Sequence, residues 1–523
     1  MKNEKSLNRM TEPIFKTRNL KDIYEEIKNL YLSDDRPWII GFSGGKDSTC
    51  MAQLVWTAIS QLPPEKMHKK IYIIGCDTLV ESPKIVERLK KSLSDMQEKA
   101  KEQHIPIQTD MVKPDLEDTF WVCLLGRGYP APSNSFRWCT ERLKIKNADR
   151  FILEKVSQYG EAIVLLGTRK DESGSRQQLL NLYEIKDSLL NRHSKFAQTY
   201  MYCPLKDFLT EDVWNYLLQN PNPWGENNRD LLSMYQEANA SECPLVVDTT
   251  TPSCGGGRFG CWTCTVVARD KSMDSLLEGG EDWLEPLAEI REELKQTQEH
   301  ETKLLVRDHK RRNGRVMFCF PEKELDDTSA GPYTLEYRKK LLEMLLNAQV
   351  KVRENGPDPN MTLILDDEIH EIQRIWRMEH GDWQNSVYQI YKKITGNELE
   401  KEDDQGLFGK TEQEILVEVA ANNNVPQVLL SRLIDAEWDA QGMTRHSKVY
   451  DKINKILSEE WRSKEELSEI KKDMIERRAD KKPFALKKCL ACGVLDEKHS
   501  EDEKKDCLKK LEKEERRREK NRR

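Results

Sequence analysis

The sequence predicts an α/β fold with three parts: a parallel-sheet core, an irregular cysteine-rich segment and a helical C-terminal region. Over residues 37–218, short apolar runs alternate with helical patterns, which is typical of parallel βαβ units in a doubly wound sheet. Residues 219–330 show little periodicity and carry clusters of cysteine and glycine. From residue 331 to residue 523 the pattern is mostly helical and charged. These observations set the expected domain boundaries.

The elements of the core follow in order along the chain. The polar segment 1–36 contains an amphipathic helix from Leu20 to Leu32. Apolar runs predict strands at 37–42, 71–78, 105–112 and 162–168. Helical periodicity follows the first strand and returns from Pro83 to Gln103, where Ile85, Leu89 and Leu93 face inward. The alternation of these elements indicates that the strands are parallel.

Composition excludes several classes of protein. The chain has 523 residues, 37% hydrophobic and 33% charged, which suits two to four domains with apolar cores. No run approaches the ~18 apolar residues of a membrane helix, and the N-terminus lacks the apolar region of a secretory signal. We therefore expect a cytoplasmic protein without membrane contact. Because the net charge is −7, nucleic-acid binding would have to come from a local basic patch.

The sequence SGGKDS lies between the first predicted strand and the helix after it. Its glycines let backbone N–H groups converge on an anion, and the helix N-terminus adds a favourable dipole. It is not a Walker A loop, which would need glycine where Ile40 stands and serine or threonine where Asp47 stands. The predicted phosphate-binding residues are Ser43, Gly44, Gly45, Lys46, Asp47 and Ser48.

On these residues the sequence resembles the PP-loop ATP pyrophosphatases, whose signature is SGGxDS. Further motifs narrow the resemblance to the phosphoadenosine phosphosulfate (PAPS) reductase branch over roughly 37–218: Asp77-Thr78, the RWCT string at 137–140, Gly167-Thr168-Arg169 and the PLKD string at 204–207. The resemblance implies an adenine nucleotide alpha hydrolase-like core. It also implies that ATP, with Mg²⁺, is cut between its α and β phosphates to make adenylated intermediates.

The resemblance also implies a nucleotide site at the ends of the strands. Strand ends of an open α/β sheet face the ligand crevice, and arginines there can clamp phosphates bidentately. The alternative is that these arginines pair with neighbouring acids on the surface. Lys46, Asp47 and Arg169 are the predicted catalytic residues. The predicted nucleotide-binding residues outside the loop are Asp77, Thr78, Gly167, Arg169 and Arg176.

Four cysteines form a candidate metal centre. The chain has 13 cysteines, an odd number, and no export signal, so reduced thiols or metal ligation are favoured over disulfides. A CxxC pair follows a glycine-rich loop that carries another cysteine, and a fourth lies in the RWCT motif. Four thiolates are a normal ligand set for a 4Fe-4S cluster. The predicted ligands are Cys139, Cys254, Cys261 and Cys264.

Other interpretations of the cysteines remain open. Zinc held by four cysteines, a redox dithiol and free core thiols compete with the cluster, and Cys243 could replace one ligand. The chain departs from PAPS reductases, which carry a nucleophilic cysteine in a C-terminal ECGxH-type motif; the nearest string here is ACGV at 491–494. The C-terminal cysteines form a small metal site or are idle thiols: Cys489, Cys492 and Cys507.

A closer resemblance is to the DNA phosphorothioation sulfurtransferase family, DndC. It rests on four segments: GRGYPAPSNSFRWCT (126–140), GCWTCTVVARDKS (260–272), RDHKRRNGRV (307–316) and GPYTLEYR (331–338). With the core, the resemblance covers roughly 20–350. It implies an ATP-hydrolysing iron–sulfur protein that installs sulfur at a non-bridging position of a DNA backbone phosphate. A cysteine desulfurase as sulfur donor and other Dnd proteins are the implied partners.

A basic run follows the cysteine-rich segment and is the candidate DNA contact. Its spacing suits a hairpin or loop that presents several cations to phosphates; a solvated, salt-bridged turn is the alternative. The predicted DNA-binding residues are Arg307, Lys310, Arg311, Arg312 and Arg315.

We therefore predict that ATP activates a backbone phosphate oxygen and that sulfur then replaces it, with AMP and pyrophosphate as products. Another PAPS reductase-like enzyme, which reduces adenylylsulfate or thiolates RNA, is one alternative. A non-catalytic DNA-binding subunit is the other.

Overall fold

A computed structural model describes residues 14–16, 18–172, 177–178, 181–186, 188–238, 260–317, 330–400, 408–438, 440 and 447–480. The chain divides into two compact units, and each is described by itself. The larger unit combines Met1–Asp308 with Pro332–Leu457, and the smaller combines His309–Gly331 with Ser458–Arg523.

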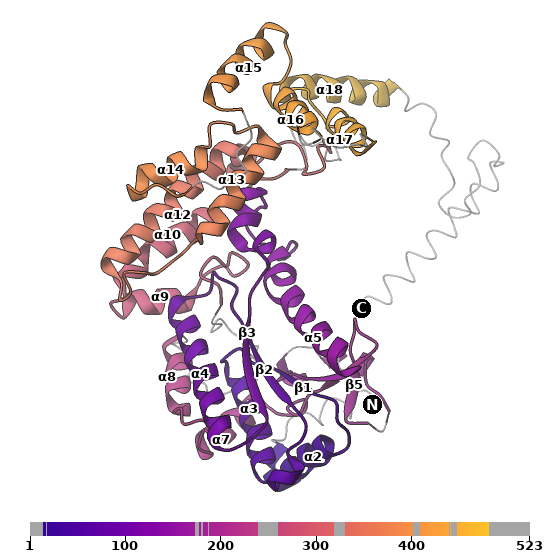
Figure 1. Cartoon of the computed structure of the whole chain (residues 1–523), viewed down its shortest axis with the longest axis vertical. Helices are drawn as coiled ribbons and strands as arrows, with labels where there is room; N and C mark the ends of the chain where they lie inside the picture. The colour runs from indigo at the N-terminus through magenta and orange to yellow at the C-terminus, as the bar shows by residue number, and fades with distance from the viewer. Residues whose placement is uncertain are drawn as a thin grey trace, which may run out of the picture. The chain divides into compact units, whose positions relative to one another are not determined.

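A mostly parallel sheet forms the centre of the larger unit (Figure 1). Its strands are β1 (Trp38–Gly41), β2 (Ile71–Cys76), β3 (Ile107–Val112), β4 (Ala162–Leu165), β5 (Leu190–Arg192) and β6 (Thr199–Tyr202). The spatial order is β3-β2-β1-β4-β6-β5, and only the β5–β6 pair is antiparallel. Because β1 lies between β2 and β4, the order of strands reverses next to it, which is where open α/β sheets place their ligands.

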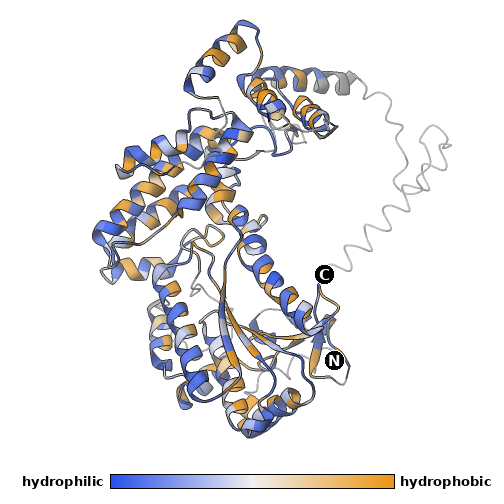
Figure 2. Cartoon of the chain, in the orientation of Figure 1, coloured by the Kyte–Doolittle hydropathy of each residue, from blue (hydrophilic) through white to orange (hydrophobic). Residues whose placement is uncertain are grey.

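Alternate residues of each strand face opposite layers of helices, because side chains alternate along a strand. Ile40 and Ile73 pack in the core shared with α2 (Leu20–Leu32), α3 (Lys46–Ser60), α4 (Pro83–Glu102), α7 (Thr210–Gln219) and α8 (Asn228–Ala238). Ile39 and Tyr72 instead pack against α5 (Lys146–Tyr159) on the other face. Burial of both faces explains why β1, β2 and β4 are continuously apolar (Figure 2).

A second core lies among helices in the same unit. It joins two π-helical turns, η4 (Val122–Gly126) and η5 (Thr140–Ile145), to α9 (Lys271–Glu278), α10 (Glu285–Gln296), α12 (Leu335–Asn355), α13 (Asp366–His380) and α14 (Ser386–Thr395). Indole N–H groups tie the distant segments together. Trp376 donates to the Leu125 carbonyl at 2.7 Å, and Trp121 donates to the Leu363 carbonyl at 2.8 Å.

The remaining elements are short turns or lie later in the chain. The single-turn helices are η1 (Ile14–Lys16), η2 (Pro64–Lys66), η3 (Leu116–Asp118), η6 (Lys170–Glu172) and η7 (Asp282–Leu284). The further helices of the larger unit are α11 (His300–Val306), α15 (Lys410–Asn422), α16 (Gln427–Trp438) and α17 (Ser447–Leu457). The smaller unit contains α18 (Lys464–Asp480). None of the described helices has the length and apolar character that a membrane span requires.

The predicted α/β fold is confirmed, with its parallel core and helical C-terminal region. Each of the four predicted strands is present, and the helix Leu20–Leu32 has the predicted bounds. The sequence analysis missed β5 and β6, whose sequences LNR and TYMY contain no long apolar run. It also missed α8, α9, α10 and α11 inside 219–330, because charged residues separate the apolar positions of these short helices.

Candidate functional site

The predicted phosphate loop, residues 43–48, links β1 to the N-terminus of α3. Gly44 has a φ of +71°, a left-handed conformation that favours glycine. The hydroxyl of Ser48 accepts from the Ser43 N–H at 3.2 Å and donates to the Gly45 carbonyl at 3.0 Å. The N-cap residue of α3 is Gly45, which has no side chain to accept from the first backbone N–H groups of the helix. The loop is thus closed by its own serines around an anion-binding helix end.

The charged residues of the loop are held by one buried arginine. Asp47 accepts from Arg169 Nε at 2.7 Å and from Lys46 Nζ at 2.9 Å. Arg169 is 1% exposed and also pairs with Asp171 at 3.2 Å. A Cβ at Gly167 would lie 3.0 Å from the Asp47 carbonyl oxygen, so this close approach requires glycine. Arg169 and Gly167 therefore support the loop from behind, and Arg169 reaches Asp47, a partner the sequence did not indicate.

Tyr235 lies over the loop from α8. Its hydroxyl accepts from the Lys46 backbone N–H at 3.3 Å, and Lys46 Nζ lies 5.5 Å from the centre of its ring. The ring is held edge-on against Trp214, with centroids 5.3 Å apart. An oxygen atom therefore already occupies one of the loop's backbone donors. Sequence reasoning missed Tyr235, because nothing in the local pattern of α8 sets it apart.

The predicted rim residues Asp77 and Thr78 are buried at the carboxyl end of β2, next to the strand that leads into the loop. The Asp77 carboxylate accepts from the Leu79 N–H at 2.9 Å, and Leu79 takes a positive φ of 64°. The Thr78 hydroxyl lies 3.4 Å from the Cys261 thiol sulfur. The sharp turn after β2 thus brings a cysteine to the same edge of the sheet as the loop.

The cysteine turn, residues 260–264, is bonded to the chain that leaves β2. Glu81 and Cys261 form an antiparallel bridge, and the Trp262 N–H donates to the Val80 carbonyl at 3.0 Å. The Cys264 N–H donates to the Cys261 carbonyl at 3.0 Å and closes the turn. These backbone bonds fix the thiols without depending on the side chains themselves.

Three of the predicted cluster ligands are neighbours. Burial raises the pKa of the Cys139 thiol, and the nearby Cys264 thiol raises it further. Burial also raises the pKa of Cys261 to about 12, and Cys139 contributes to that shift. The cation of Lys144 opposes the rise in the pKa of Cys261, and metal ligation would stabilise the thiolates further. Thiols are the donor type that an iron–sulfur group takes, but the three described thiols do not by themselves form a group that could hold a metal ion.

The fourth predicted ligand, Cys254, lies outside the described residues, as do Cys243, Cys489, Cys492, Cys507 and Arg176. Among the residues that the structure does describe, no three His, Cys, Asp or Glu side chains are grouped closely enough to hold a metal ion. The cluster and the full ligand set remain predictions.

The predicted DNA-binding residues fall in two places. Arg307 belongs to the larger unit, where burial lowers its pKa and its backbone bridges Tyr333. Lys310 to Val316 form a tight hairpin in the smaller unit, with a positive φ of 73° at Gly314. In this basic hairpin the Arg311 N–H donates to the Arg315 carbonyl at 2.9 Å. Its exposed arginines are Arg311, Arg312 and Arg315.

The basic hairpin packs against a segment of the smaller unit that contains Glu459 and Glu460. The Glu460 N–H donates to the Gly314 carbonyl at 2.8 Å, and a Cβ at Gly314 would overlap the Glu459 side chain. Lys310 Nζ lies 4.7 Å from the centre of the Trp461 ring. The hairpin shape agrees with the sequence analysis, and its cations face a mixed electrostatic environment. DNA contact by these residues remains a prediction.

Comparison with known proteins identifies the core. Residues 37–266 match the model of the phosphoadenosine phosphosulfate reductase domain family, so the chain contains a PAPS reductase-like domain. The match extends beyond the end of α7 and includes the cysteine turn.

One curated relative and several solved structures are similar to this chain. An uncharacterized protein of Methanocaldococcus jannaschii is 26% identical over 200 residues, which are 38% of this chain and 35% of that protein. This chain therefore aligns with about a third of the relative's length. Three similar solved structures each have a TM-score of 0.25. A mutant FMN adenylyltransferase of Candida glabrata is 10% identical, and the match covers 40% of this chain and 59% of that one. The U34-tRNA thiolase of Methanococcus maripaludis with its 4Fe-4S cluster is 13% identical (53% of this chain, 80% of that one), and the NAD⁺ synthetase of Burkholderia pseudomallei is 14% identical (55% of this chain, 91% of that one).

Proposed function

We propose that this chain is an ATP-using sulfurtransferase of DNA phosphorothioation. The observation that carries the proposal is the 3.4 Å contact between the Thr78 hydroxyl and the Cys261 thiol at the carboxyl end of β2. β1 and β2 are adjacent and parallel, so the phosphate loop and the cysteine turn share one edge of the sheet. Nucleotide activation and sulfur chemistry therefore have a common crevice. The DndC-like segments support DNA as the acceptor.

The reaction follows from the weakness of a phosphate oxygen as a leaving group. An oxygen of the backbone phosphate attacks the α phosphorus of ATP, and pyrophosphate leaves. Sulfur at the oxidation level of sulfide then attacks the backbone phosphorus, and AMP leaves with the original oxygen. Loop amides and Lys46 stabilise the charge that develops on pyrophosphate. Mg²⁺ would accompany ATP, and Asp47 is the residue of the loop whose carboxylate could help to position it.

The phosphate loop and the cysteine turn form the two halves of the crevice, and each would have its own role. Lys46 turns from Asp47 to the phosphates, while Arg169 retains Asp47 and keeps the loop in shape. Cys139, Cys261 and Cys264 would hold the iron–sulfur group together with Cys254, and such a group supplies thiolate-bound iron and sulfide near the activated phosphate. A cysteine desulfurase would supply persulfide sulfur, and a dithiol reductant would bring it to the sulfide level while its own thiols are oxidised to a disulfide. Other Dnd proteins would act with this chain in the cytoplasm.

The decisive experiment compares products. DNA from cells with and without the chain is digested, and nucleoside dimers are analysed by mass spectrometry for a sulfur-containing linkage. The Cys261→Ser variant serves as the matched control, because it keeps the loop. We expect sulfur-linked dimers with the wild-type chain alone. Dimers without sulfur, together with sulfite or thiolated RNA, would replace the DNA assignment with one of the other PAPS reductase-like activities.

We also propose that the basic hairpin contributes to DNA affinity. Neutralised phosphates release counterions, so affinity should fall steeply with salt, with a slope near −0.9 per contact. Replacing Arg311, Arg312 and Arg315 together with alanine should flatten that slope by roughly two to three units. ATP-dependent pyrophosphate release without DNA should be unchanged. An unaltered slope would assign the hairpin to a solvated turn.

A further inference from the structure

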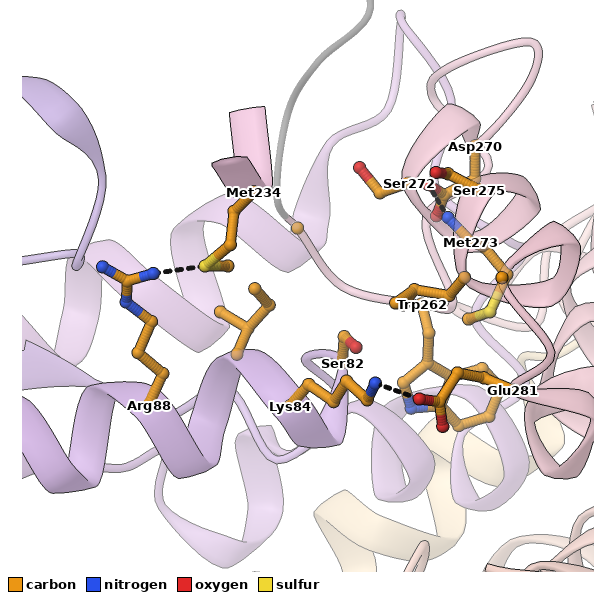
Figure 3. Close-up of a pocket in the computed structure, with 14 residues that line it drawn as sticks. Ser82, Lys84, Arg88, Met234, Trp262, Asp270, Ser272, Met273, Ser275 and Glu281 are labelled. Atoms are coloured by element: carbon orange, nitrogen blue, oxygen red, sulfur yellow. Dashed lines mark hydrogen bonds and ion pairs between the residues drawn. The ribbon is translucent and has the colours of Figure 1, made fainter. Parts of the chain in front are cut away.

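A cavity of about 630 Å³ lies beside the crevice, between the start of α4 and α9 (Figure 3). Apolar side chains such as Ile85, Met273 and Leu276 form part of its lining, and Trp262 of the cysteine turn closes one side. Serine hydroxyls and cations interrupt this apolar surface. The lining therefore suits a ligand that carries both an apolar and a charged part.

The cations of the cavity come from α4. Lys84 and Arg88 are four residues apart, so they lie on one face of that helix. Arg88 contacts the Met234 sulfur, and among the described residues it has no carboxylate within ion-pair distance. Ser82 precedes α4 and makes no capping hydrogen bond, and its buried hydroxyl has no partner in the described part of the chain. A guanidinium and a hydroxyl are thus available at the N-terminal end of a long helix.

The acids of the cavity are, by contrast, already engaged. The Asp270 carboxylate caps α9 by accepting from the Met273 N–H at 3.2 Å. Glu281 pairs with Lys84 at 2.5 Å and accepts from the Trp283 indole at 2.6 Å. Glu281 is therefore ion-paired and Asp270 caps a helix, whereas Arg88 has no acidic partner among the described residues. This imbalance favours an anionic ligand.

The position of the cavity links the two halves of the crevice. Leu89 follows Arg88, and its Cδ1 would lie 3.9 Å from a Cβ at Gly44 of the phosphate loop. Tyr235 follows Met234 and contacts the loop amide of Lys46. At the other side, Gly260 and Trp262 belong to the cysteine turn. Helices α4 and α8, which contribute to the lining, thus also contact the phosphate loop, and the cysteine turn contributes two lining residues.

We propose that this cavity is a second anion site, which binds the phosphate or sulfate ester group of the acceptor through Arg88 and Ser82. The proposal rests on the proposed function, because it assigns the cavity beside the cysteine turn to the acceptor. Arg88 gives a bidentate contact to the ester oxygens, and Ser82 donates a hydroxyl. The site is distinct from the phosphate loop and from the basic hairpin.

The test measures binding by the full chain, purified anaerobically, for a short DNA duplex, adenosine 5′-phosphosulfate and ATP. Variants Arg88→Gln and Ser82→Ala are compared with Arg88→Lys and with Lys91→Gln, an exposed lysine of the same helix that pairs with Asp95. We expect Arg88→Gln to weaken acceptor binding about tenfold or more, as for the loss of a hydrogen bond to a charged group. Arg88→Lys should recover part of the loss. ATP affinity and the melting temperature should match the wild type.

The two acceptors distinguish the sources of the anion. A loss confined to DNA, with a salt slope reduced by about one unit, supports the cavity as the site of the backbone phosphate. A loss confined to adenosine 5′-phosphosulfate supports the cavity but overturns DNA as its ligand. Unchanged affinity for both overturns the cavity proposal. If the wild type does not bind ATP and does not release pyrophosphate, the proposed function fails. The comparison of anion binding by the wild type and Arg88→Gln still tests the cavity proposal in that case.

Discussion

The phosphate loop and the cysteine turn reach the same edge of the sheet by different means. The loop is local: consecutive residues between β1 and α3 close it through their own serine hydrogen bonds. The cysteine turn comes from far along the chain and is held by backbone bonds to Val80 and Glu81. Its other side rests on the helical core, where Trp262 contacts Trp121 with ring centroids 5.8 Å apart.

This difference indicates that the two halves of the crevice can be altered separately. Changes in the loop should affect nucleotide chemistry and leave the turn in place. Changes in the helical core should loosen the turn and leave the loop in place. The predictions below test that separation, beginning with the largest expected effect.

Within the loop, Lys46→Ala and Asp47→Ala should have different secondary effects. Both should lower pyrophosphate release, on the order of 10²–10³-fold, as for the removal of a group that stabilises transition-state charge. Lys46 is a loop cation whose loss leaves Asp47 paired with Arg169, so stability should be retained. Asp47→Ala removes the nearest carboxylate from a buried guanidinium and should also lower the melting temperature.

Pyrophosphate release and thermal unfolding of the purified variants measure these two effects. Normal pyrophosphate release by both variants would contradict the assignment of the loop. ADP in place of AMP as the wild-type product would contradict the cut after the α phosphate. Equal melting temperatures would show that Asp171 and the Phe208 carbonyl satisfy Arg169 without Asp47.

In the cysteine turn, replacing Cys139, Cys261 or Cys264 singly with serine should lower the iron content of anaerobically purified protein. The wild type should be brown, with broad absorption near ~400 nm that bleaches on reduction. Because the loop does not depend on these thiols, ATP binding should persist in each variant. Cys203→Ser, at a buried thiol directly after β6, is the matched control for iron content. A colourless protein with one zinc per chain would replace the cluster with a structural zinc site.

The contrast between the two halves also explains what the sequence could predict. The loop and the first four strands are short, contiguous patterns, so local reasoning located them. The partner of Arg169 is 122 residues away, and the cavity is formed by three helices that are distant in sequence. No spacing rule reports such contacts. The cysteines were found by their residue type, but the backbone bonds that place them were not, because backbone pairing in a turn leaves no residue signature.

The helical core contains a buried carboxyl that should make the stability of the protein depend on pH. Burial raises the pKa of Glu368, in the first turn of α13, to about 7. One of its oxygens accepts from the Leu365 N–H at 2.9 Å, and the other has no hydrogen-bond partner among the described residues. A carboxyl whose pKa is higher in the folded state than its ordinary 4.5 favours folding below pH 4.5. That contribution is lost as pH rises through 7.

The loss should amount to about 3 kcal/mol between pH 4.5 and values above 7. Glu368→Gln should remove this slope, because the amide stays neutral and still accepts from Leu365. Thermal unfolding across the pH range measures the change. Glu371→Gln, at an acid of the same helix that pairs with Arg374, is the control. An identical pH slope in the wild type and Glu368→Gln would mean that Glu368 is ionised in the folded protein.

The smallest effect is expected at Tyr235, which contacts the phosphate loop from α8. Its hydroxyl accepts from the Lys46 N–H that a phosphate oxygen would use, and α8 carries it next to Met234 of the cavity. A hydrogen bond of this kind is worth about 0.5–1.5 kcal/mol, so Tyr235→Phe should raise ATP affinity by about two- to tenfold. The ring packing on Trp214 is kept. Titration of ATP into wild type and variant measures the change. Weaker binding by Tyr235→Phe would show instead that the hydroxyl contacts the nucleotide, and the loop would then be completed by a residue from outside its own segment.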